Sequence, residues 1–207
     1  MFHYNNKPVR SWWKQLSQTV PLNMKHRDLP THVHGQVLKH IYHQGDMAKL
    51  EVLMEYGGIY LDYDVIVVNS MNDLLHYNMT LGKVKKPKFI AGIIIGNKDA
   101  LFLKMWYEAY RKYKANSWEY NCATVPYNIY IENPNLVHVE FYKLTTPDFF
   151  KRDLLLMKTI NWRDLYVVHL MSHELKVQIT PDSIKQWNST LAAVMRYIYY
   201  GSDNFQP

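Results

Sequence analysis

A run of apolar residues at helical spacing precedes a pair of glycines in the first third of the chain. Along residues 46–56 the apolar positions recur three or four apart, as on one face of a helix, at Met47, Leu50, Leu53 and Met54. Gly57 and Gly58 then supply a C-terminal stop. The pattern predicts a helix over residues 46–56.

Apolar stretches rich in β-branched residues predict the strands. Residues 59–61 run into Asp62-Tyr63-Asp64 and then into residues 65–68, which indicates one buried strand interrupted by acidic side chains. Further strands are expected over residues 89–95, 136–141 and 166–170.

The remaining periodic segments predict helices. They cover residues 99–114, part of residues 121–133 before Pro134, and the amphipathic stretch 181–200. Residues 1–34 show no steady periodicity. Because strands alternate with helices, the expected fold class is α/β, a sandwich with a mainly parallel sheet.

The composition is that of a folded globular protein. Of the 207 residues, 48% are hydrophobic, 14% aromatic and 20% charged, which excludes disordered and fibrous classes. The length favours a single domain over residues 1–207, and no stretch approaches the ~20 continuous apolar residues of a membrane span. The N-terminus shows no apolar core of a secretory signal.

The net charge says little about the class of binding partner. A formal charge of +6 reflects either ordinary solubility or anionic partners such as diphosphates, and no nucleic-acid motif accompanies it. Cys122 is the single cysteine, which excludes an internal disulfide. The sequons that begin at Asn78 and Asn188 would be surface sites in a secreted protein.

Asp62 and Asp64 are the strongest candidates for catalytic residues. Two carboxylates two positions apart on a strand point to the same side, so these two are expected to converge. Like charges in an apolar segment are costly unless a cation compensates them, and Mn²⁺ or Mg²⁺ accepts carboxylate oxygens while leaving positions open for phosphate. The alternative is a pair of acids at a strand end that meets solvent or a basic neighbour.

The block from Gln44 to Val67 carries a family resemblance. Its second half, Tyr56-Gly57-Gly58-Ile59-Tyr60-Leu61-Asp62-Tyr63-Asp64, matches fully the Y-G-G-x-Y-x-D-x-D pattern of a glycosyltransferase family. The chain resembles family thirty-two, which has a D-x-D sugar-binding region and includes yeast mannosyltransferases and bacterial capsule enzymes. The central region of the resemblance spans residues 35–115, and fainter likeness covers most of the chain.

The resemblance implies a GT-A fold, Mn²⁺ dependence, a nucleotide-sugar donor carrying UDP or GDP, and transfer with retention of anomeric configuration. It implies that Asp46 and Lys49 hold hydroxyls of the donor sugar, with Gly58 and Tyr60 as further donor-binding candidates. The alternatives are a plain helix N-cap for Asp46 and a solvated surface charge for Lys49. The acceptor would be a glycan, a lipid or a protein, and a eukaryotic member would work in the Golgi lumen or another secretory compartment.

Four departures from the family pattern bear on activity. Gly45 stands where Ser is usual and Lys49 where Arg is usual, which replaces a forked donor by a single ammonium. Ala91-Gly92 stands where the family tends to have Asn. Family members also begin with a strand and a helix that hold the nucleotide base. This chain is expected to start after that portion and so to lack the family's first strand and helix.

His169 is the third candidate metal ligand. It follows the apolar run 165–168, so it is expected at the C-terminal end of a strand, where ligand crevices of open α/β sheets lie. Two aspartates leave a divalent ion short of ligands, and an imidazole could complete the set, with His173 as substitute. The alternative is a half-buried histidine bonded to backbone groups.

Two other function classes fit parts of the sequence. Asp62-Tyr63-Asp64-Val65-Ile66 matches the start of a haloacid-dehalogenase-type phosphatase signature, although the later acid pair of that class does not follow. A degenerate relative that binds a glycan or partner protein without turnover would explain Gly45 and Lys49.

Overall fold

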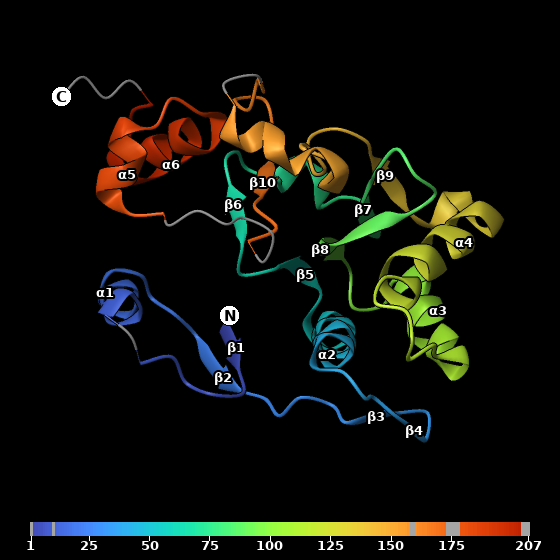
Figure 1. The fold of residues 1–207 in the computed structure, drawn as a ribbon. Coiled ribbons are helices and arrows are strands. Elements are labelled where there is room, and N and C mark those ends of the chain that lie inside the picture. The colour runs from blue at the N-terminus through green and yellow to red at the C-terminus, as the bar shows by residue number, and fades with distance from the viewer. Residues whose placement is uncertain (1, 10, 158–159, 173–178, 204–207) are drawn as a thin grey trace.

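The computed structural model describes residues 2–9, 11–157, 160–172 and 179–203. A four-stranded sheet lies at its centre, in the strand order β5-β8-β7-β9 (Figure 1). The strands are β5 (Gly58–Leu61), β7 (Met79–Lys83), β8 (Phe89–Gly96) and β9 (His138–Glu140). β8 pairs antiparallel with both β5 and β7, whereas β7 and β9 are parallel.

The prediction of a mainly parallel sheet was therefore wrong. Residues 84–88 join β7 to β8, and a connection this short can only build an antiparallel hairpin. A parallel pair needs a long crossover, which the helical segment between β8 and β9 provides. The α/β class holds, but the sheet is mixed.

Three helices pack in succession beside this sheet: α2 (Ile41–Tyr56), α3 (Leu101–Ala109) and α4 (Val125–Glu132). The apolar face predicted for α2 is buried in the main core, with Met47 and Leu50 at 0% exposure. The helix begins at Ile41 with His40 as N-cap, rather than at Asp46. Asp46 thus lies within the helix, and its alternative interpretation as an N-cap was wrong.

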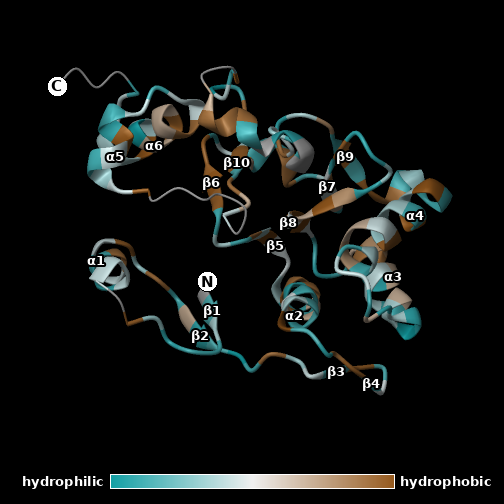
Figure 2. Cartoon of the chain, viewed as in Figure 1, coloured by the Kyte–Doolittle hydropathy of each residue, from teal (hydrophilic) through white to brown (hydrophobic). Residues whose placement is uncertain are grey.

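A second, two-stranded sheet and the last two helices form another part of the molecule. β6 (Val65–Val67) pairs antiparallel with β10 (Val167–His169), and both strands are strongly apolar in Figure 2. The final helices, α5 (Pro181–Gln186) and α6 (Thr190–Tyr200), pack together, and α6 joins β10 in an apolar cluster. The predicted stretch 181–200 is thus interrupted, because Ser189 caps α6 as a new helix.

The N-terminal residues form a strand-helix-strand unit that the hydrophobic pattern did not predict. Its elements are β1 (Phe2–Tyr4), α1 (Ser11–Thr19) and β2 (Met24–His26), with β1 and β2 parallel. Lys25 and Arg27 bind Glu55 on α2 and so connect the unit to the main body. A small hairpin, β3 (His32–Val33) and β4 (Gln36–Val37), leads into α2.

Other boundaries differ in detail from the sequence prediction. The predicted helix 99–114 ends as α3 at Ala109 and continues as a 3₁₀ turn over Tyr110–Lys112. A π-helical turn over Tyr120–Thr124 precedes α4. No helix in the described part of the chain is long and apolar enough to cross a membrane.

Candidate active site

Asp62, Tyr63 and Asp64 form the turn between β5 and β6. The backbone N–H of Asp62 donates to Gly92 O at 2.8 Å, and the N–H of Val65 donates back to Asp62 O at 3.1 Å. β5 belongs to the central sheet and β6 pairs with β10, so the chain changes sheets at this point. The prediction of one continuous strand was wrong, because β5 pairs with β8 and β6 with β10 in separate sheets.

The turn nevertheless brings the predicted ligands together. One oxygen each from Asp62 and Asp64 and one ring nitrogen of His169 all lie within 4.8 Å of one another. His169 is the last residue of β10, as expected from its place after an apolar run. His173 lies outside the described residues.

Hydrogen bonds determine which nitrogen of His169 is available. Its Nε2 lies 3.2 Å from Asp64 Oδ1, and an ionised carboxylate only accepts hydrogen bonds, so Nε2 carries the proton in the neutral ring. The other nitrogen, Nδ1, is buried and has no hydrogen-bond partner. A lone pair on Nδ1 is therefore left for a ligand. One ion bound by both His169 and Asp64 would instead take Nε2, in place of the present hydrogen bond between the two side chains.

Asp64 is held in its ionised form. Burial alone would raise the pKa of Asp64, but the hydrogen bonds from His169 and from the backbone N–H of Ser172 outweigh burial and lower this pKa well below its usual range. The Ser172 N–H lies 2.8 Å from Asp64 Oδ2. A carboxylate that stays charged can serve as a metal ligand across the physiological pH range.

Lys49 links the helix α2 to the acidic turn. Its ammonium lies 3.1 Å from Asp46 Oδ1, 3.5 Å from Asp62 Oδ1 and 3.1 Å from Ala91 O. Burial would lower the pKa of Lys49, but the carboxylates of Asp46 and Asp62 raise it overall, so the ammonium stays charged. Lys49 is 8% exposed and is not the solvated surface charge that the sequence left open. Three acceptor oxygens thus lie within 3.5 Å of this ammonium.

Tyr60 supports Asp62 from the other side. Its hydroxyl donates to Asp62 Oδ1 at 2.6 Å, and burial raises the pKa of Tyr60, so the hydroxyl keeps its proton. Asp46 Oδ2 is buried and has no hydrogen-bond partner. Asp46 therefore retains one acceptor atom for a ligand.

Gly92 permits the close approach of the cluster. A Cβ at this position would stand 2.5 Å from His169 Cε1 and 3.0 Å from both His169 Nδ1 and Asp62 Oδ2. Only glycine leaves room for the ring and the carboxylate to meet over the backbone of β8. In the sequence, Gly92 stood out only as a departure from the family pattern. Its neighbours along the chain do not reveal which side chains pack over a glycine in the fold.

These groups line one cavity of about 480 Å³. Five carboxylates line it against two ammonium groups: Asp46, Asp62, Asp64, Glu119 and Asp148 against Lys49 and Lys88. An excess of negative charge would repel a diphosphate, so an anionic ligand requires a bound cation here. Gly58, in contrast, begins β5 and is not among the residues that line this cavity.

Substitution of His169 by Ala is expected to raise the Mn²⁺ concentration that half-saturates the site by about tenfold or more, because it removes the imidazole of the three-residue cluster. The measurement is a Mn²⁺ titration in which the unfolding temperature is recorded at each concentration. His32→Ala is the control, since His32 is exposed on β3. An unchanged half-saturation in His169→Ala would exclude His169 from the metal site.

Known proteins match the chain at this site and beyond it. Residues 2–80 match the family described as glycosyltransferase sugar-binding region containing DXD motif. Glucan organizing enzyme 1 of Cryptococcus neoformans var. grubii is 30% identical over 148 residues, which make up 67% of this chain and 40% of that protein. The chain thus spans less than half of that relative, and no solved structure matches. The chain belongs to the glycosyltransferases whose sugar-binding region contains a DXD motif.

Proposed function

We propose that this chain binds a nucleotide sugar with Mn²⁺ and transfers the sugar to an acceptor. The observation that carries the proposal is the convergence of Asp62, Asp64 and His169 in a cavity with excess negative charge. Two carboxylate oxygens and an imidazole suit Mn²⁺ and leave further positions for diphosphate oxygens. Bound there, the ion would supply Lewis-acid stabilisation of charge on a departing nucleoside diphosphate.

The protein's own groups orient this site. Tyr60 and Lys49 hold one oxygen of Asp62, while the backbone N–H of Ser172 holds Asp64. Asp46 offers its unpartnered Oδ2 as acceptor for a sugar hydroxyl. Lys49 already faces two carboxylates and one carbonyl oxygen, those of Asp46, Asp62 and Ala91. In this proposal the role of Lys49 is mainly to position Asp46 and Asp62.

The family supports transfer with retention, a UDP- or GDP-sugar donor and a secretory location such as the Golgi lumen. Asn78 and Asn188, which begin the two sequons, are both exposed, as a glycosylated protein of that compartment requires. The phosphatase alternative is less well supported, because the family match includes the D-x-D block itself. A catalytically degenerate relative would bind its ligand at the same site but would not turn over the donor.

The test compares donor binding with and without Mn²⁺ across a panel of UDP- and GDP-sugars. We expect Mn²⁺-dependent stabilisation by at least one donor, followed by slow donor hydrolysis measured as released UDP or GDP. Asp46→Asn is expected to weaken binding of the sugar nucleotide about tenfold more than binding of the free nucleotide, because it changes the proposed acceptor for the sugar hydroxyl.

Stability must be measured in parallel, because Asp46 also pairs with buried Lys49. Loss of one partner of a buried ion pair can cost about 3 kcal/mol, so Asp46→Asn is compared with wild type well below its unfolding temperature. Binding of donors without Mn²⁺, or equal losses for both ligands, would contradict the proposed donor site. Binding without any release of nucleotide would favour the degenerate relative.

A further inference from the structure

Three large aromatic side chains line the cavity and are open to solvent. Tyr63 is 92% exposed, Trp118 is 50% exposed and Tyr42 is 39% exposed. Apolar ring surface in water is unfavourable, and exposed aromatic residues gathered at one cavity mark a binding surface. None of the three rings is a candidate metal ligand.

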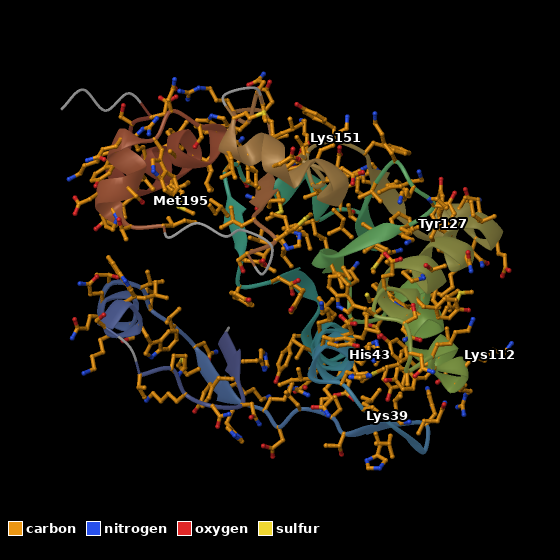
Figure 3. All side chains as sticks on the ribbon, viewed as in Figure 1. Lys39, His43, Lys112, Tyr127, Lys151 and Met195 are labelled. Carbon is orange, nitrogen blue, oxygen red and sulfur yellow. The ribbon has the colours of Figure 1, made fainter. Side chains whose placement is uncertain are left out.

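The orientation of two of these rings is fixed by their neighbours. The ring of Tyr42 lies parallel to His40, with centroids 5.0 Å apart, and meets the edge of His43 at 4.4 Å. His43, labelled on α2 in Figure 3, is itself held by the Tyr113 hydroxyl 2.6 Å from its Nδ1. Trp118 stands at 82° to Tyr42, with centroids 6.4 Å apart. Rings held in this way lose little side-chain entropy when a ligand stacks on them.

The pair of Tyr42 and Trp118 lies away from the acidic turn. Tyr42 and Asp46 are four residues apart on α2 and therefore share a face of the helix. Along the helix axis, Tyr42 lies roughly 10 Å from Lys49. Asp46, the proposed contact of the donor sugar, lies between the aromatic pair and Lys49. A molecule on the aromatic pair would therefore lie beyond the donor sugar, on the side opposite the acidic turn.

Polar groups beside the rings indicate the chemistry of that molecule. Glu119 follows Trp118 and pairs with Lys88, and both line the same cavity together with Asp148. Aromatic faces bordered by charged hydrogen-bonding groups match a sugar ring, which has an apolar C–H face and hydroxyls around its edge. A lipid chain would remove water from these charged groups and could not form hydrogen bonds with them.

We infer that Tyr42 and Trp118 form a stacking surface for the acceptor, and that the acceptor is a glycan. The inference rests on the proposed function, because it places the acceptor next to the proposed donor site. It selects one of the three acceptor classes that the family allows.

The test uses neutral hexasaccharides of α-1,4-glucose, β-1,3-glucose and α-1,6-mannose as probes, with binding to the full chain measured by calorimetry. At least one probe should bind the wild type. Trp118→Ala should weaken that probe by about tenfold or more, and Tyr42→Ala by several-fold, since each removes a stacking face. Trp118→Phe, which keeps a ring, should retain most of the affinity. Trp12→Ala is the matched control, because Trp12 is 59% exposed on α1 and does not line the cavity.

Nucleotide binding with Mn²⁺ separates the possible failures. If no hexasaccharide binds, or if Trp118→Ala binds the probe as well as wild type does, the inference is wrong. If Trp118→Ala weakens free UDP or GDP as much as the probe, the rings bind the nucleobase and the inference is also wrong. If wild type binds the probe in a Trp118-dependent manner but no nucleotide, the glycan surface stands and the proposed donor site fails.

Discussion

Asp62→Asn and Asp64→Asn are each expected to abolish Mn²⁺-dependent donor binding, reducing affinity by more than a hundredfold. Each change removes a charged ligand from the three-residue cluster without changing its volume, and a neutral amide oxygen is a much poorer ligand for a divalent cation. Binding is measured by calorimetry with UDP or GDP at saturating Mn²⁺. Wild-type-like Mn²⁺ stabilisation in both variants would exclude a metal site at the acidic turn.

The two substitutions should differ in their effect on stability. Asp64 is buried and accepts hydrogen bonds from His169 and Ser172, so Asp64→Asn should lower the free energy of unfolding by about 1–3 kcal/mol. Asp62 is more exposed, and Lys49 already offsets its charge. Asp62→Asn should therefore cost less than Asp64→Asn, because the amide oxygen can still accept from Tyr60 and Asp46 still pairs with Lys49. Chemical denaturation of both variants without metal measures this difference, and Asp99→Asn, at an exposed residue outside the cavity, controls for the loss of one negative charge.

The acidic turn shows what the sequence could predict about the site. The spacing of Asp62 and Asp64 predicted that their side chains converge, and the apolar run before His169 predicted its place at a strand end. The three side chains do lie together, but around a turn and not along an extended strand. In the structure a turn brings them together, because the flanking strands pair with β8 and β10 in different sheets. Strand pairing depends on contacts far apart in the chain, which local hydrophobic patterns do not contain.

The helix α2 shows the same limit for element boundaries. Its apolar face was predicted because burial imposes the periodicity of Met47, Leu50 and Leu53. Its start was missed, because His40 caps the helix without a side-chain hydrogen bond and Ile41 carries no start signal. Lys49 likewise could not be recognised as a link between Asp46 and Asp62, since its partners depend on the packing of α2 against β5.

Gly92→Ala is expected to disrupt the metal site almost as strongly as loss of a ligand. The added Cβ would stand 2.5 Å from His169 Cε1 and 3.0 Å from Asp62 Oδ2, so the imidazole and the carboxylate must move apart. We expect Mn²⁺ affinity to fall by more than tenfold and the free energy of unfolding to fall by about 1–3 kcal/mol. Mn²⁺ titrations and chemical denaturation of the same preparation measure both effects.

Gly45→Ala provides the matched control, because it adds the same methyl group at another residue that lines the cavity. A Cβ on Gly45 would meet nothing within 4 Å, and the residue lies inside α2, so the change should add about 0.5–1 kcal/mol of stability and leave Mn²⁺ affinity unchanged. A double-mutant cycle then tests the cause. If Gly92→Ala acts by displacing the ring of His169, it should weaken Mn²⁺ binding much less in the His169→Ala background. Independent, additive losses would show instead that Gly92 acts through Asp62 or the backbone of β8 and not through the approach of His169.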